Sequence, residues 1–283
     1  MIGVLFALTS GFGYGISDFV GGIASRRVPA LRVVLVSYPV ALTLLTVLAT
    51  VVGGHVSTPA VVWGTLCGFS QAFGVWWFYA ALAAGPMSLV SPLTAVLVSA
   101  VPIVVGTVLL GERPSGVACV GIALALVAVV LVSRESPDAD DQRPHRFTAK
   151  VAWLTLGSGL AFGLNFVLIH QAPHDAGLWP LVFARASATV VVVVIATATA
   201  NLAPPSGVPL RLALAAGALD TVSNVSMLLA LHASLLSLTS VLISLYPAAT
   251  VGLALLVLKE RVTRWQATGM VLALAAVAMI AVG

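Results

Sequence analysis

The chain has 283 residues, of which 60% are hydrophobic and only 8% are charged, and its mean hydropathy is +1.12. A soluble domain carries about 25% charged residues, so this composition excludes a protein whose surface faces only water. The lipid bilayer is therefore the predicted partner of most side chains. The net charge of +4 comes with basic residues in short loops and no patch of interleaved aromatic residues, a pattern that fits membrane topology better than nucleic-acid binding.

Continuous apolar runs of about 20 residues follow one another along the chain, and each is long enough to cross the hydrocarbon layer as a helix. The runs lack the alternation of apolar and polar residues that is typical of membrane β-barrels. The sequence therefore predicts an all-α integral membrane protein with ten transmembrane helices. The predicted spans are 3–24, 31–53, 60–83, 88–110, 115–133, 150–170, 177–200, 209–232, 235–258 and 265–282.

A charged linker at 134–149 separates a first half, 1–133, from a second half, 150–283. The two halves match at a constant offset of 148 residues, and each holds five predicted spans. Because five is odd, the second copy must be inverted in the membrane relative to the first. Inverted repeats are a transporter architecture in which the substrate site lies near the middle of the bilayer. The matching pairs include Ser10-Gly11 with Ser158-Gly159 and Glu112-Arg113 with Glu260-Arg261.

The fourth span of each half ends in a similar motif, LLGERPSG or VLKERVTR, and the chain opens with GYGISDFVGGIASRR. With the repeat, these segments make the chain resemble the EamA-type drug/metabolite transporter superfamily. The resemblance implies a secondary transporter in a bacterial plasma membrane that needs no cofactor. It also implies a small-molecule partner, often an exported metabolite, amino acid or drug-like compound, without naming which.

Two other classes of protein stay open at this stage. An intramembrane enzyme would need a nucleophile with a base, or a set of metal ligands, and the sequence contains neither GxSxG nor HExxH. The histidines have no spacing that makes a metal site. A passive channel or a scaffold is not separated from a carrier by sequence alone. The oligomeric state is not readable either.

Three charged residues lie well inside predicted spans: Asp18, Arg185 and Asp220. A charge at the centre of a bilayer costs about 3 kcal/mol or more, so each needs a reason. Counted from the nearest basic residue on the same membrane face, the two carboxylates lie at similar depths, roughly 12 and 13 Å. We therefore predict a proton relay and a substrate anchor. The alternative is a structural ion pair that locks the helices together.

Several polar and aromatic residues extend this candidate pathway. Ser223 and Asn224 share a helical face with the second carboxylate, and Asn165 and Gln71 add amides at mid-depth. Trp77 belongs to an aromatic cluster that could hold an apolar or cationic substrate. The alternatives are hydrogen bonds between helices for the polar side chains and an aromatic belt at the interface for the tryptophan.

Two further features concern the shape and the orientation of the bundle. Pro247 lies inside the ninth predicted span, where it can bend or unwind the helix. Glu112 and Glu260 are interpreted as structural terminators of the repeats. Of the loop lysines and arginines, eleven lie in odd-numbered loops and one in an even-numbered loop, which predicts cytoplasmic odd loops and external termini. Members of the family that the chain resembles more often have cytoplasmic termini.

Overall fold

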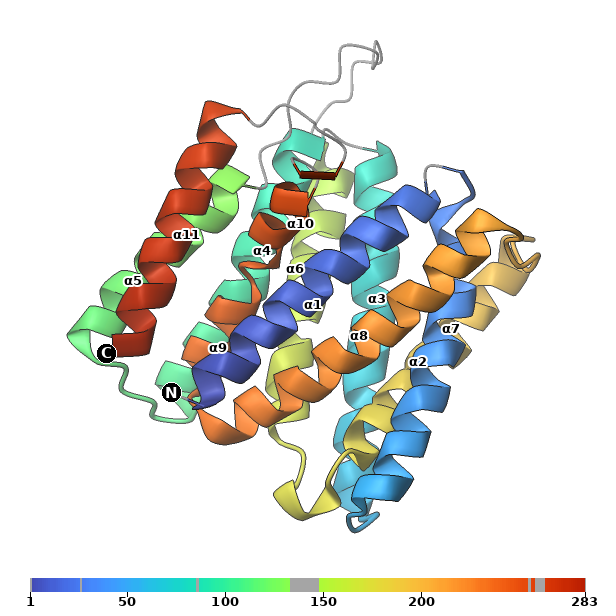
Figure 1. The fold of residues 1–283 in the computed structure, drawn as a ribbon, viewed down its shortest axis with the longest axis horizontal. Helices are drawn as coiled ribbons and strands as arrows, with labels where there is room; N and C mark the ends of the chain where they lie inside the picture. The colour runs from blue at the N-terminus through green and yellow to red at the C-terminus, as the bar shows by residue number, and fades with distance from the viewer. Residues whose placement is uncertain are drawn as a thin grey trace.

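A computed structural model describes residues 2–25, 27–84, 87–132, 148–253, 256–257 and 263–282, and within these ranges the chain forms helices and no strand (Figure 1). Most of the predicted linker and the second Glu-Arg motif lie outside the described residues. So does the Gly85-Pro86 break that separates two of the predicted spans.

The helices of the first half are α1 (Ile2–Ser25), α2 (Ala30–Val52), α3 (Thr58–Ala84), α4 (Met87–Val104), its π-helical extension η1 (Val105–Leu109), and α5 (Gly116–Val132). Those of the second half are α6 (Ala149–His170), the short 3-10 turn η2 (His174–Ala176), α7 (Trp179–Ala198), α8 (Val208–Ala233), α9 (Leu236–Ile243), α10 (Tyr246–Leu253) and α11 (Arg264–Val282). The N- and C-terminal ends of the chain lie at the same end of the bundle (Figure 1).

Each predicted span coincides with one of these helices or with two adjoining segments, and the boundaries differ by at most two residues wherever both ends are described. The agreement follows from the long apolar runs, which end where charge, proline or glycine interrupts them. In the part of the chain that the structure describes, six helices are long and apolar enough to cross a membrane: α1, α2, α6, α7, α8 and α11. The structure is therefore that of an all-helical membrane protein.

One predicted span is not continuous. The sequence suggested a single helix over 235–258, but the structure breaks it into α9 and α10, with Ser244 and Leu245 in a turn between them. Pro247 follows the break and carries no N–H. It therefore cannot donate the hydrogen bond to the carbonyl oxygen four residues earlier that a continuous helix requires. The proline thus interrupts this span instead of merely bending it.

Most of the packing joins the two halves of the chain. α1 packs on α8, α2 on α7 and α8, α3 on α6 and α7, α4 chiefly on α6, and α5 on α11. Glycines allow the close approaches: a Cβ at Gly121 in α5 would lie 2.8 Å from the side chain of Ile280, and one at Gly269 in α11 would lie 2.8 Å from the side chain of Val132.

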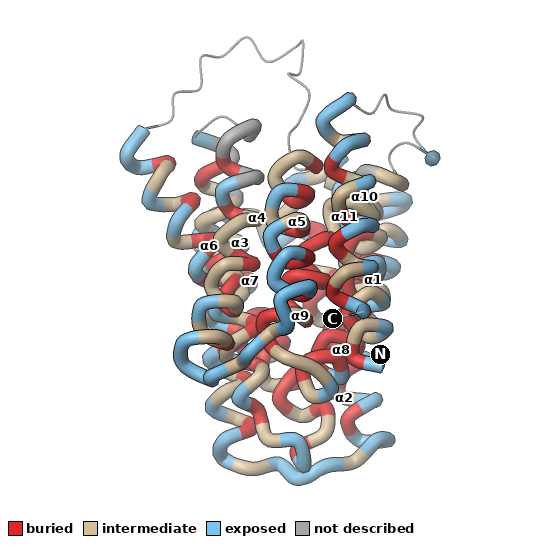
Figure 2. The backbone as a smooth tube through the Cα atoms, turned by 90° about the vertical axis from the view of Figure 1, so that its left-hand side faces the viewer, coloured by how far each residue is buried: buried red, intermediate tan, exposed pale blue. Residues whose placement is uncertain are grey.

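The outer surface of the bundle is largely apolar. Buried positions face the interior and exposed positions face outward along the tube in Figure 2. Large apolar side chains are among the exposed ones, including Leu5, Val47, Trp153 and Val194. An exposed apolar belt of this kind is expected where lipid is the solvent.

Candidate functional site

A cavity of about 650 Å³ lies inside the bundle. It extends from mid-bundle residues such as Asn165 to the end of the bundle where α1 stops at Ser25 and α2 starts at Ala30. Among the described residues, its lining draws on both halves of the chain, from every α-helix except α7. We call it the central cavity. Its volume falls in the range of small-molecule sites, about 300–1,000 Å³.

Asp18 reaches the central cavity from the middle of α1. Its side chain is exposed to this cavity, although the residue lies within a helix that can span the membrane. It shares one face of α1 with Tyr14, Ser17 and Gly21, which also line the cavity, by i, i+3, i+4 and i+7 spacing. Asp18 makes no hydrogen bond or ion pair with a described residue.

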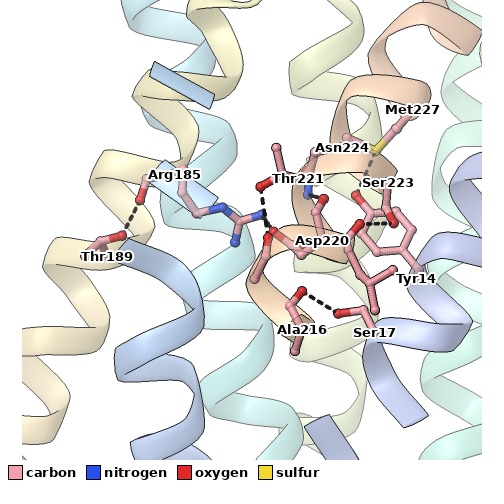
Figure 3. Close-up of polar contacts among 12 residues, drawn as sticks. Tyr14, Ser17, Arg185, Thr189, Ala216, Asp220, Thr221, Ser223, Asn224 and Met227 are labelled. Carbon is pink, nitrogen blue, oxygen red and sulfur yellow. Dashed lines mark hydrogen bonds and ion pairs between the residues drawn. The ribbon is translucent and has the colours of Figure 1, made fainter. Parts of the chain in front are cut away.

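Asp220 lines the same cavity from α8, but its charge is balanced. The Asp220 Oδ2 atom lies 2.6 Å from the Nη2 atom of Arg185 on α7, as Figure 3 shows. Arg185 is only 2% exposed and does not line the cavity, and its guanidinium lies 4.5 Å from the centre of the Tyr38 ring. Arg185 therefore lies outside the cavity lining, between the carboxylate of Asp220 and the ring of Tyr38.

The other predicted site residues divide into two groups. Asn165 and Gln71 line the cavity, and the Asn165 amide also donates a hydrogen bond to the Cys67 carbonyl oxygen, 3.1 Å away. Ser223, Asn224 and Trp77 lie off the cavity wall, among the described residues that pack the helices together.

These three side chains have visible packing roles. Ser223 is fully buried, and its carbonyl oxygen accepts a 2.9 Å hydrogen bond from Ser10 on α1. The Asn224 amide donates to the backbone oxygen of Asp220, 2.7 Å away. The Trp77 ring lies beside Gly157 of α6, where a Cβ would come within 2.9 Å of it. Ser223 thus faces α1, whereas the hydrogen bond of Asn224 stays within α8.

Several lining residues were not singled out from the sequence. Tyr14, Tyr38, Phe162, Phe166 and Tyr246 give the cavity aromatic walls. One signal was available, because Tyr14 and Asp18 are four residues apart on a face of α1 that is otherwise small or polar. The sequence alone gave no such signal for the phenylalanines, since an apolar residue in a span can face lipid or the interior equally well.

Glu112 caps the start of α9 at the opposite end of the bundle, which we call the closed end because no described cavity-lining residue comes from it. Its Oε1 atom accepts a 2.5 Å hydrogen bond from the Leu236 N–H, and its Oε2 atom accepts a 3.0 Å bond from the Ser237 N–H. A carboxylate at the first two N–H groups of α9 also faces the positive end of that helix. His174 of η2 stacks on His232 of α8 at the same end, with ring centres 3.8 Å apart. The predicted terminator of the first repeat therefore caps a helix of the second half.

The sequence model of the EamA-like transporter family matches the chain twice, at residues 1–134 and at residues 149–282. The chain belongs to the EamA-like transporter family. It is therefore a multi-pass membrane transporter of small molecules, from a family of transporters and not of enzymes. The two EamA matches begin 148 residues apart (149 − 1), the offset at which the halves of the sequence match.

A solved crystal structure of another protein has the EamA-like fold of this chain. It covers 99% of this chain and 97% of its own, with a TM-score of 0.77 and 15% sequence identity. At that identity the likeness shows the fold alone. No curated protein sequence matches the chain.

Proposed function

We propose that this EamA-like protein is a secondary transporter that exports a small metabolite, amino acid or drug-like compound in exchange for protons. The central cavity holds the compound, and Asp18 carries the exchanged proton. One observation carries the proposal: a cavity of small-molecule size contains a carboxylate without an ion-pair partner among the described residues, at a depth where charge is costly. Such a carboxylate is explained if the proton and the transported compound neutralise it at different stages of the transport cycle.

The proposed architecture has ten crossings in two inverted five-helix repeats, 1–133 and 150–283, joined by the linker at 134–149. The packing of α5 against α11 supports it. Gly121 meets Ile280, and Gly269 meets Val132, so each contact becomes the other when 148 is added to one residue and subtracted from its partner. Contacts that exchange in this way are expected when two similar repeats pack about a pseudo-twofold axis.

Alternating access is supported by a difference between the two ends of the bundle, because the central cavity reaches only one of them among the described residues. The cavity reaches the end where α1 stops, and no lining residue among those described comes from the end where Glu112 caps α9. A passive channel would need a path between both ends at once. We propose that rocking one repeat against the other closes the open end and opens the capped one.

The loop charges support a central cavity that opens to the cytoplasm. The cavity reaches the end of the bundle where Arg27, Arg32 and Arg264 lie, and the positive-inside rule assigns such an end to the cytoplasm. The compound would then enter from the cytoplasm, and both termini would lie outside. A fluorescent or phosphatase fusion at the C-terminus decides the orientation, since a cytoplasmic C-terminus would contradict it.

A compound screen in proteoliposomes with an imposed pH gradient tests the function. Wild-type protein should drive net flux of at least one compound, and Asp18→Asn and Asp220→Asn should abolish that flux. Asp175→Asn is the matched control, because Asp175 is exposed in η2 and lies outside the cavity lining. If both cavity variants insert correctly and respond to the gradient as wild type does, the carboxylates are structural and the proton mechanism is wrong.

A further inference from the structure

The charges around the central cavity do not cancel. Two carboxylates line it, and the Arg185 guanidinium, 2.6 Å from Asp220, compensates only one of them. Among the described lining residues there is no lysine, arginine or histidine. With Asp18 ionised, the cavity therefore carries one excess negative charge.

The walls around this charge suit a positive ligand with an apolar body. Tyr14 lies one helical turn before Asp18 on the same face of α1, and Phe162 and Phe166 line the cavity from α6. The electron-rich face of an aromatic ring attracts a cation, and the attraction grows when water is excluded. The amides of Gln71 and Asn165 add polar contacts at mid-depth without adding charge.

Arg185 is the one described cation that forms an ion pair with a carboxylate of the cavity lining, and its position bears on which ligands are excluded. It is buried behind the wall, bound to Asp220 and stacked on Tyr38. Because Arg185 does not line the cavity, a ligand carboxylate or phosphate would meet no cation on the wall without a rearrangement, and it would enter a cavity that already holds excess negative charge. Anionic ligands are therefore disfavoured twice, by the lack of a cationic partner on the wall and by repulsion.

We infer that the compound carried in the central cavity is an organic cation with an apolar or aromatic body, bound through ion pairing with Asp18 and through the aromatic walls. This inference rests on the proposed transport function and names its substrate class. It excludes anions. It also disfavours free amino acids, whose carboxylate would have no cationic partner among the described lining residues.

Two ions of nearly the same shape and opposite charge provide the test. Tetraphenylphosphonium and tetraphenylborate both carry four phenyl groups, and their binding to the full chain in nanodiscs can be measured against protein-free nanodiscs. Tetraethylammonium serves as a smaller cation in case size prevents entry. The expected result is saturable binding of at least one cation and none of the borate.

Variants of the same carboxylate sharpen this test. Asp18→Asn should raise the Kd of the cation on the order of tenfold or more, since it removes the ion pair. Asp18→Glu should retain binding, and Asp175→Asn should bind as wild type does. The inference is overturned by saturable borate binding, by cation binding that Asp18→Asn leaves unchanged, or by no saturable binding of either cation.

Failure of this inference is distinguishable from failure of the proposed function. If the pH-gradient screen finds an anionic or zwitterionic compound whose flux depends on Asp18, the transport function stands and the substrate class is wrong. If no compound moves with the gradient, the proton-exchange function itself fails, whatever the binding of the phosphonium.

Discussion

The same substitution, aspartate to asparagine, should have opposite effects on stability at the two carboxylates of the central cavity. Asp220→Asn leaves the Arg185 charge buried without its partner 2.6 Å away. Breaking a buried ion pair from one side costs about 3–5 kcal/mol, because the remaining charge is uncompensated. Asp18→Asn breaks no ion pair among the described residues and removes a charge that is costly at that depth.

These energies convert to melting temperatures that can be measured. For a chain of this size a loss of 3–5 kcal/mol corresponds to a fall in Tm of roughly 10 °C. The assay is thermal unfolding of detergent-solubilised protein, followed by tryptophan fluorescence at one heating rate for all variants, since unfolding of membrane proteins is often irreversible. Asp18→Asn should melt at or above the wild-type temperature.

A double variant separates the ion pair from the packing of its side chains. Arg185→Met with Asp220→Leu replaces both charges by apolar side chains, a change that is often neutral or stabilising for a buried pair. Its Tm should return close to the wild-type value. The reasoning is refuted if Asp220→Asn melts within about 2 °C of wild type, a difference that corresponds to less than about 1 kcal/mol.

Two further predictions concern the closed end and the packing of the repeats. Glu112→Gln removes the negative charge and one of the two hydrogen bonds at the start of α9, because an amide NH2 group cannot accept from a backbone N–H. A cysteine introduced by Ser234→Cys should then react with a membrane-impermeant maleimide roughly tenfold faster, and an unchanged rate would contradict the role of this cap. Gly121→Leu and Gly269→Leu should lower the Tm by similar amounts, because their contacts are equivalent. Gly116→Ala should leave the Tm unchanged, since nothing lies within 4 Å of a Cβ at that position. Clearly unequal losses at Gly121 and Gly269 would argue against the pseudo-twofold packing.

The bounds of the helices could be predicted closely from the sequence. Which side chains point into the cavity and which point toward lipid or another helix could not. Long apolar runs define where a chain can cross lipid, so helix ends agreed with the structure within two residues. In lipid, however, the outer and inner faces of a helix are both apolar, and periodicity does not separate them. This is why Phe162 and Phe166 were not foreseen in the cavity, and why Ser223 and Asn224 were expected there but lie off its wall, Ser223 against α1 and Asn224 hydrogen-bonded within α8.

Charges were easier to find than to pair. Depth along the helices singled out Asp18, Arg185 and Asp220 together, but not which carboxylate the arginine binds. That choice depends on how α7 and α8 approach each other, which no local pattern records. The role of Glu112 was hidden for the same reason, because its partner N–H groups are more than 120 residues away along the chain.

Proton movement itself tests the central claim, that Asp18 exchanges a proton for the transported compound. Proteoliposomes loaded with a pH-sensitive dye, at equal pH on both sides, receive a transported compound that has no dissociable proton. As the compound enters, protons should leave and the lumen should become alkaline with wild type and with Asp175→Asn, but not with Asp18→Asn. Entry of the compound without a change in lumen pH, or an undiminished change with Asp18→Asn, would contradict the account.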